Sequence, residues 1–345
     1  MKKLLSALVI VAVVGFVGYR LLLGTTAGQD MLMTRGINAM MNAPTAAPFD
    51  GLRVFVCGSR SPLPDPQRAQ ACILVDTGEH QIIVDTGAGS PATLQNHGVS
   101  LDRLRAVLLT HFHSDHIAAL GDINLASWIA GRPDPLHVIG GRGVEKVVQG
   151  FNRAYALDRT YRWDHHGKAF LPPELGVMEP QAVKPGTFFD AGGLRVTAIS
   201  VDHSPISPAY AYRFDYKGRS VVISGDTVTT ETLEQGAQAA DLLLHDALSA
   251  HLITTMADAA AAAGRERQAH LLRDVLDYHA HTTELPPLAE RAGVRMLAFY
   301  HMVPPPRNEL VERIFMRGVP DDVVLTHDGM WFNLPVDSTD IEVIE

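Results

Sequence analysis

The sequence predicts an α/β protein of αββα type, in which two β-sheets pack face to face between outer layers of helices. Several short apolar runs, typical of buried strands, end directly at an aspartate or a histidine. Such polar strand ends indicate two sheets that meet along one rim, and we expect the candidate site on that rim. The positions concerned are Asp85, His111, His203 and Asp226.

The length and composition set outer limits on this fold. The chain has 345 residues, of which 46% are hydrophobic, enough for one large core or two modest ones. Its net charge of −9 provides no general basic field for nucleic acid.

The N-terminal residues 1–27 are predicted to form a signal-anchor or a secretory signal peptide. Two lysines precede Leu4–Tyr19, which carries no charge, and the stretch to Leu23 contains only Arg20. An arginine is rare within a cleavable signal but can snorkel from an anchor, which favours the anchor. The lysines keep the N-terminus inside, so we expect a membrane-anchored or exported protein whose main domain lies outside the cytoplasm, periplasmic in a Gram-negative cell. Residues 28–50 are predicted as a linker and residues 51–345 as that domain.

The first two predicted strands of the domain each carry one cysteine. They are Arg53–Cys57 and Cys72–Asp76, separated by a segment with three prolines. Antiparallel pairing of these strands would allow a disulfide, which would stabilise the fold by about 3 kcal/mol. Two free buried thiols remain the alternative.

The segment Thr110–His116 is the most informative motif of the chain. It follows the apolar run Arg105–Thr110 and holds three histidines and an aspartate within six consecutive positions. Imidazole nitrogens and carboxylate oxygens are ligands that zinc and similar divalent ions prefer. Four ligands on one loop cannot all reach a single ion without strain, so the spacing indicates two neighbouring ions.

The rest of the domain is predicted more coarsely. Residues 132–185 are the least regular part, and we expect them to wall the candidate pocket. Three later strands are predicted at Leu194–Ser200, Tyr210–Tyr216 and Arg219–Ser224, and helices at Val144–Tyr155, Leu233–Ala240 and Met256–His279, the last weakened by Gly264.

These motifs together resemble the metallo-β-lactamase-fold hydrolases. The run 111–116 is similar to their His-x-His-x-Asp-His signature, and four further motifs follow the family's order. The resemblance covers roughly residues 52–335 and implies the αββα fold of that family. The four motifs are Val84–Gly87, Val201–His203, Ser224–Thr227 and Phe299–His301.

The resemblance implies a ligand set for two divalent metal ions, with zinc preferred. Two such ions lower the pKa of a shared water and act as Lewis acids on an ester oxygen. Asp115 is assigned a part in catalysis as well as ligation, and Asp85 is expected to accept a hydrogen bond from a ligand imidazole. One ion takes His111, His113 and His203, the other takes Asp115, His116 and His301, and Asp226 bridges both.

The branch of the family that the chain most resembles is the ribonuclease Z and arylsulfatase group. There a histidine about 22 positions before the last ligand lies near the bond that is cut, and this spacing from His301 gives His279. Such a histidine can donate a proton to the leaving oxygen. His281 is the alternative proton donor if the family's His-Thr-Thr motif is a better guide than the spacing. Otherwise His281 is expected to orient the residues that bind the metal ions.

The predicted function is a dinuclear-metal hydrolase that attacks small anionic esters, phosphodiesters or aryl sulfates, with a metal-bound hydroxide. Alternatives are a ribonuclease Z-type endonuclease, a lactone or thioester hydrolase, and a non-catalytic membrane-tethered binding module. His203 and Asp226 are only 23 positions apart, which leaves no room for a tRNA-gripping arm, so tRNA is expected to be an unlikely partner. The N-terminal segment makes the membrane a partner, and oligomerisation is left open.

Overall fold

The computed structural model describes residues 15–42 and 49–345, in two compact units that cover residues 1–48 and 49–345. In the first unit, residues 15–24 are helical and α2 spans Thr26–Met41, of which residues 28–41 belong to the predicted linker. The predicted signal segment falls partly on residues 1–14, which lie outside the described residues. Among the helices of the described ranges, none is long and apolar enough to cross a membrane.

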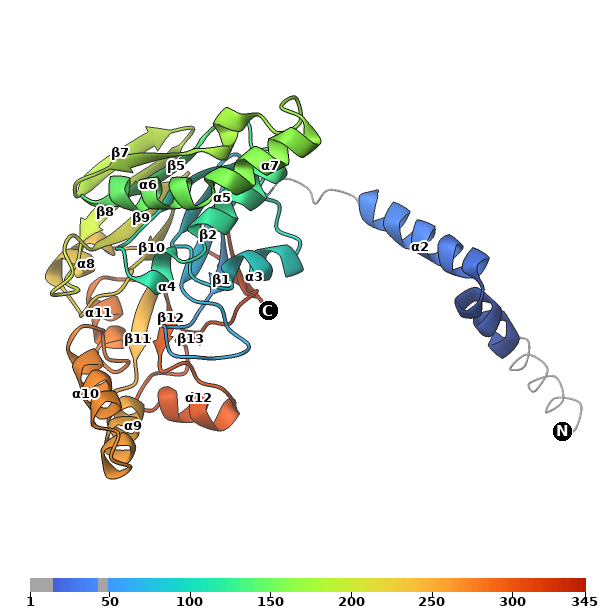
Figure 1. The fold of residues 1–345 in the computed structure, drawn as a ribbon. Coiled ribbons are helices and arrows are strands. Elements are labelled where there is room, and N and C mark those ends of the chain that lie inside the picture. Colours follow the sequence, from blue (N-terminus) through green and yellow to red (C-terminus); the bar gives the residue numbers. More distant parts are fainter. Residues whose placement is uncertain (1–14, 43–48) are drawn as a thin grey trace, which may run out of the picture. The chain divides into compact units, whose positions relative to one another are not determined.

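The second unit is a sandwich of two sheets with helices on both outer faces, which is the predicted αββα architecture (Figure 1). The first sheet has eight strands. From β3 to β6 its strands run parallel, so their carboxyl ends share one edge. In spatial order the sheet consists of β15 (Glu342–Ile344), β14 (Trp331–Pro335), β1 (Gly51–Gly58), β2 (Cys72–Asp76), β3 (Gln81–Val84), β4 (Leu104–Leu108), β5 (Leu136–Gly140) and β6 (Met178–Ala182).

The second sheet has seven strands and combines both pairing modes. Its strands β10 to β13 are parallel, whereas β7 to β10 form antiparallel hairpins. In spatial order the sheet consists of β13 (Val324–Leu325), β12 (Met296–Val303), β11 (Leu242–Leu248), β10 (Arg219–Ile223), β9 (Tyr210–Tyr216), β8 (Leu194–Ser200) and β7 (Gly186–Ala191).

The helices bury one face each against these sheets. Leu94, Ile123 and Val148 bring α3, α5 and α6 onto the first sheet, while Leu233 and Leu288 bring α8 and α11 onto the second. The helices of this unit are α3 (Ser90–Asn96), α4 (Ser114–Ile117), α5 (Leu120–Ile129), α6 (Val144–Ala154), α7 (Ala156–His166), α8 (Glu231–Gly236), α9 (Ala250–Ala262), α10 (Glu266–Asp274), α11 (Leu285–Arg291) and α12 (Glu309–Phe315), with short 3-10 turns at Pro173–Gly176 and Val275–Asp277.

Strand alternation divides the apolar residues between separate layers. On β1, Val54 and Val56 face the second sheet, whereas Phe55 and Cys57 face the helices, because successive side chains point to opposite sides of a strand. Cys57 and Cys72 form a disulfide that closes the loop between β1 and β2. Of the two alternatives for these cysteines, the structure therefore has the cross-link.

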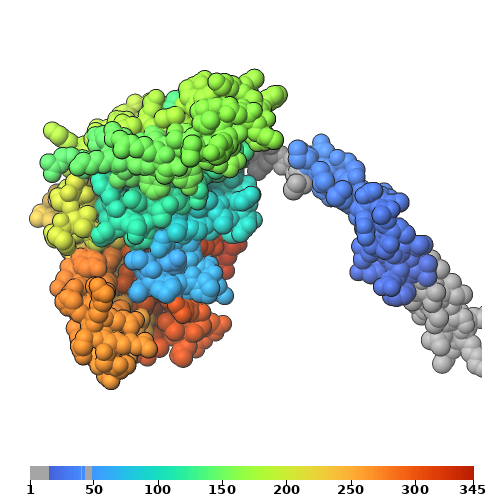
Figure 2. Space-filling model, in the orientation of Figure 1, coloured from blue at the N-terminus to red at the C-terminus, as the bar shows by residue number. Residues whose placement is uncertain are grey.

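Two segments differ from their predicted form. The helix expected over Met256–His279 is divided into α9 and α10, because Gly264 adopts a left-handed conformation with φ of 69° that ends the first helix. Residues 132–185 are more regular than expected and contain β5, α6, α7 and β6. Figure 2 shows the helices of this green segment at one end of the unit, with the orange α9 and α10 at the other.

Candidate functional site

The predicted site residues meet at the carboxyl ends of strands from both sheets. Asp85 directly follows β3, the motif 110–116 follows β4, and His203 and Asp226 follow β8 and β10. His301 lies within β12, near its end. The two sheets therefore supply the site jointly, as expected from the polar strand ends.

The motif segment divides its side chains between an extended stretch and a helix start. His113 has extended backbone angles and caps α4, whose first turn holds Asp115 and His116. His111, Asp115 and His116 are buried, whereas His113 is partly exposed. The segment thus buries three potential ligands and leaves the imidazole of His113 accessible to solvent.

Asp226 lies at the centre of the cluster. Its carboxylate is 3.2 Å from His116 Nε2 and 3.4 Å from His301 Nδ1. It also lies 3.8 Å from His111 Nε2 and 3.9 Å from His203 Nε2. A single carboxylate therefore contacts histidines from both predicted ligand sets, which is the position that a bridging ligand requires.

The structure brings all seven predicted ligands into two overlapping groups, within each of which the ligand atoms lie within 4.8 Å of one another. Three buried atoms of this cluster, His116 Nε2, Asp226 Oδ1 and His301 Nδ1, have no hydrogen-bond partner in the described structure. Unpaired buried polar atoms are costly, and metal coordination would satisfy them. The residues present therefore fit divalent ions. The two groups are His111, His113, His203 and Asp226, and Asp115, His116, Asp226 and His301.

Burial and neighbouring charges set the protonation of the cluster. Burial lowers the pKa of His111, His113 and His203, and the neighbouring imidazoles lower those of His111 and His113 further. These three histidines are therefore neutral near pH 7, the form in which imidazole binds a metal. Burial would also lower the pKa of His116, but the carboxylates around it, Asp226 foremost, raise it well above its ordinary value. The same carboxylates attract a divalent cation.

Hydrogen bonds behind the cluster orient two of the imidazoles. His116 Nδ1 lies 2.8 Å from Asp85 Oδ2, and Thr110 donates to the same carboxylate from its backbone N and its Oγ1. His203 Nδ1 donates to the backbone oxygen of Tyr278 at 3.0 Å. In both histidines the second ring nitrogen, Nε2, is left to face Asp226.

Local backbone distortions aim two of the side chains. Asp85 has φ of 60° and His301 has φ of 43°, both in the left-handed region that such residues seldom adopt. His301 is also the extra residue where β12 shifts register against β11, between Tyr300 and Met302. A bulge of this kind turns a side chain that would otherwise alternate away from the site.

His279 lies beside the cluster and His281 lies apart from it. The ring of His279 stacks on that of His301 at 5.4 Å, and its Nδ1 is 2.8 Å from Asp246 Oδ2. His281 instead lies 3.1 Å from the backbone oxygen of Leu276. The spacing from His301 thus indicates His279, which reaches the cluster. The His-Thr-Thr motif indicates His281, which does not.

Asp246 is a further site residue beyond the predicted metal ligands. It is fully buried, contacts both His245 and His279, and forms a further potential ligand group with Asp226 and His301. By the family resemblance, the pair His245–Asp246, which follows the apolar run 241–244, is expected at a strand end close to the site, in a supporting role rather than as a ligand. The structure places both residues within β11.

A pocket of about 280 Å³ opens onto the cluster. The disulfide-closed loop after β1 contributes Ser61 and Leu63 to its lining, and the segment after α10 contributes Val275 and Tyr278. Residues 132–185 contribute nothing to this lining, so the prediction that they wall the pocket is wrong. They follow the motif segment in sequence, but β5 and β6 carry them away along the first sheet.

Comparison with known proteins identifies the family. Residues 65–253 match the Metallo-beta-lactamase superfamily. A protein named ribonuclease Z from Mycobacterium bovis is 37% identical over 256 residues, which cover 73% of this chain and 86% of that protein. A ribonuclease Z from Mycobacterium marinum is 36% identical over 73% of this chain and 87% of the relative.

Solved structures share the fold at low sequence identity. The metallo-beta-lactamase fold protein YhfI from Bacillus subtilis aligns with a TM-score of 0.59 and 19% identity, over 82% of this chain and 98% of that one. Human tRNase Z, short form, aligns with a TM-score of 0.58 and 17% identity, over 82% of this chain and 100% of that one. Both support the two-sheet architecture.

The expectation that tRNA is an unlikely partner is overturned by these relatives. Proteins named ribonuclease Z, 37% and 36% identical, match the alternative function of the sequence analysis better than the reading as a small-ester hydrolase. The argument from the short link between His203 and Asp226 failed for a physical reason. That link, which holds only β9 and β10, limits one mode of gripping RNA and leaves the cluster that would cut it unchanged.

The family match covers more than half of the chain, and the cluster of histidines and aspartates stands where the strands of both sheets converge. Divalent metal ions are the cofactors that this fold implies, and the groups present could bind them. The chain belongs to the metallo-beta-lactamase superfamily and is a metal-dependent hydrolase.

Proposed function

We propose that this protein is a ribonuclease Z-type endonuclease that hydrolyses a phosphodiester bond of RNA. The observation that carries the proposal is the convergence of two ligand groups on Asp226 beside His279. The names of the 37% and 36% identical relatives support RNA over an aryl sulfate. Zinc is the ion we propose, because a set of imidazoles and carboxylates suits it.

The metal ions would be held by the seven residues of the two groups. When bound, they would supply Lewis acidity and a water of lowered pKa at the phosphate. Asp85 fixes His116 through a 2.8 Å contact, and the backbone of Tyr278 fixes His203. Both contacts hold the imidazoles in one orientation before substrate arrives, so little reorganisation accompanies the reaction.

His279 is the proposed proton donor to the leaving oxygen. Its Nδ1 contacts the buried carboxylate of Asp246, which leaves Nε2 as the nitrogen able to meet substrate. Asp246 would stabilise the protonated ring and hold its tautomer, so the pair can deliver a proton and recover it later. His279 also lines the pocket, whereas His281 does not.

The pocket walls suit a nucleotide beside the phosphate. Tyr278 lines the pocket, is partly exposed and packs edge-on to His203, with ring centroids 5.3 Å apart. Leu63 and Val275 add apolar surface nearby. A nucleobase next to the cut phosphate could stack on this wall without base-specific hydrogen bonds.

The proposal is tested by a substrate panel on one preparation of the full chain. A precursor tRNA with a 3′ extension, bis-p-nitrophenyl phosphate, p-nitrophenyl sulfate and an acyl-homoserine lactone are assayed side by side with zinc or manganese. We expect specific cleavage of the RNA, lost on chelation and restored by metal. Hydrolysis of only the sulfate or only the lactone would overturn the proposal.

A matched pair of variants separates this activity from a contaminating ribonuclease. Asp226→Ala removes the carboxylate shared by both groups, while Asp190→Ala removes an exposed carboxylate on β7 that pairs with Arg195. RNA cleavage should disappear in the first variant and persist in the second. Equal cleavage by both would assign the activity to another protein.

We also propose that the protein is anchored or exported, with the hydrolase domain outside the cytoplasm. The basic start and apolar stretch within residues 1–27 support this location, and so does the Cys57–Cys72 disulfide, since disulfides persist mainly in oxidising compartments. Protease accessibility in intact cells, followed with an antibody to the domain, tests it. Full protection until the cytoplasmic membrane is broken would refute it.

A further inference from the structure

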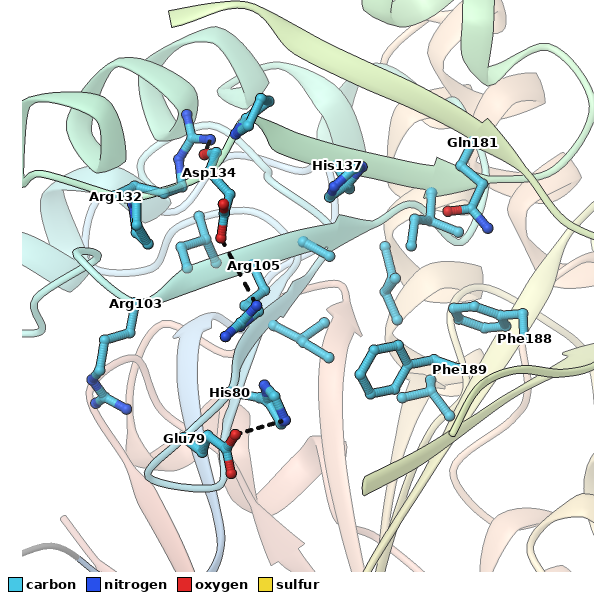
Figure 3. A pocket seen from close by; sticks show the side chains of 18 of the residues that line it. Glu79, His80, Arg103, Arg105, Arg132, Asp134, His137, Gln181, Phe188 and Phe189 are labelled. Carbon is cyan, nitrogen blue, oxygen red and sulfur yellow. Dashed lines mark hydrogen bonds and ion pairs between the residues drawn. The ribbon is translucent and has the colours of Figure 1, made fainter. Parts of the chain in front are cut away.

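A second pocket, of about 540 Å³, lies between the two sheets at the opposite ends of β3 and β4. Its floor is apolar and includes Ile82, Ala106 and Val196 from both sheets. Phe188 and Phe189 of β7 form one side, and Arg103 and Arg105 stand on the other (Figure 3). Pockets that bind small molecules have this size and this combination of apolar walls with a few polar groups.

Two register shifts open the sandwich at this corner. Arg105 is the extra residue where β4 shifts against β3, and Phe188 is the extra residue where β7 shifts against β8. The first shift places a charged residue beside the core, and the second lets two successive phenylalanines pack toward it. The inner side of β5 also presents His137 rather than an apolar side chain here.

His80 is an unpartnered polar group in this pocket. Only 6% of the residue is exposed, yet neither ring nitrogen has a hydrogen-bond partner among the described residues. Its ring packs edge-on against Phe189, with centroids 5.8 Å apart, and the nearest carboxylate oxygen, of Glu79, is 3.8 Å away. A buried nitrogen without a partner is unfavourable, so a ligand that accepts a hydrogen bond from it would be stabilised.

Charges of both signs lie next to His80, namely the Glu79 carboxylate, 3.8 Å from its Nε2, and the Arg105 guanidinium. Arg105 is paired only at 3.9 Å, with Asp134, whereas Arg103 is held by both oxygens of Asp76 at 3.2 Å. Burial lowers the pKa of His80, and Arg105 lowers it further against the opposing effect of Glu79. The imidazole is therefore neutral, with one N–H to donate, and a guanidinium stands beside it.

We propose that this pocket binds a small carboxylate with a flat apolar body, such as an aryl carboxylate. The carboxylate would accept hydrogen bonds from Arg105 and His80, and the apolar body would lie on the floor against Phe188 and Phe189. This site is separate from the metal cluster, which lies at the carboxyl ends of the same strands.

The probe for this site is 2-naphthoate, with 2-naphthalenemethanol as its uncharged analogue. Equilibrium dialysis against the full chain, in chelator, measures binding while excluding coordination of the carboxylate to metal. We expect about one naphthoate per chain and binding of the alcohol weaker by about tenfold or more, because it lacks the charge-assisted hydrogen bonds. Absence of saturable naphthoate binding, or equal binding of the alcohol, would overturn the proposal.

Variants locate the bound probe. Arg105→Gln and His80→Phe should each weaken naphthoate binding about tenfold while leaving the alcohol nearly unchanged. Arg195→Gln, which removes an exposed arginine of the second sheet that does not line this pocket, is the matched control and should bind like the parent protein. Asp226→Ala should also bind normally. Normal binding by Arg105→Gln, or loss of binding in Asp226→Ala, would place the probe elsewhere and overturn the proposal.

Discussion

The two ends of β3 and β4 carry opposite kinds of polar site. At the carboxyl ends, Asp85 is buried and bonded to His116 and to Thr110, so both of its carboxylate oxygens have partners. At the amino ends, His80 is equally buried but has no partner in the described structure. One end is thus a preorganised set of metal-binding side chains, and the other is an apolar cavity lined by an imidazole without a partner in the described structure.

The largest effect is expected at the centre of the metal-binding end. Asp226→Ala removes the carboxylate that contacts histidines of both groups, so hydrolytic activity should fall below detection. Elemental analysis of protein prepared without chelator should show the bound metal fall from about two ions per chain to one or fewer. Retention of both ions would show that Asp226 does not bridge them.

The second-largest effect is expected for His279 and distinguishes its role from that of His281, the other histidine after α10. His279→Ala should lower kcat by about 10²-fold or more, because it removes the proton donor held by Asp246. Metal content should stay unchanged, and the defect should shrink for a p-nitrophenolate leaving group, which needs little protonation. His281→Ala is the control and should be near normal, since His281 contacts only a backbone oxygen nearby. The reverse ranking would exchange their roles.

A smaller effect is expected behind the cluster. Asp85→Asn keeps the shape of the side chain but weakens its hold on His116, so metal affinity should fall about 10- to 100-fold. Competition with a chromogenic chelator measures this change. Activity at saturating metal should largely recover, whereas that of Asp226→Ala should not. Failure to recover would mean that Asp85 itself takes part in the reaction.

The contrast between the two ends also explains what the sequence could predict. His203 and Asp226 were found because each stands just after an apolar run, and a rim of strand ends is where such groups meet. Arg105 and Phe188, by contrast, lie at register shifts that no local pattern marks. The inter-sheet pocket depends on how two sheets pair across long sequence separations, and local patterns do not encode this.

The smallest effect is expected at the amino ends of β3 and β4. It is a change in the free energy of unfolding, and whether that energy rises or falls is the informative result. His80→Phe retains a ring against Phe189 and removes two buried nitrogens that lack partners, so the free energy of unfolding should rise by about 1 kcal/mol. Urea denaturation of the full chain measures it. His137→Phe, on the pocket rim, is the control and should bring no gain, because it replaces an imidazole that lies 3.7 Å from Glu179 and is half exposed. A clear loss of stability in His80→Phe would show that its nitrogens are satisfied in solution, and the two ends would then differ less than their contacts indicate.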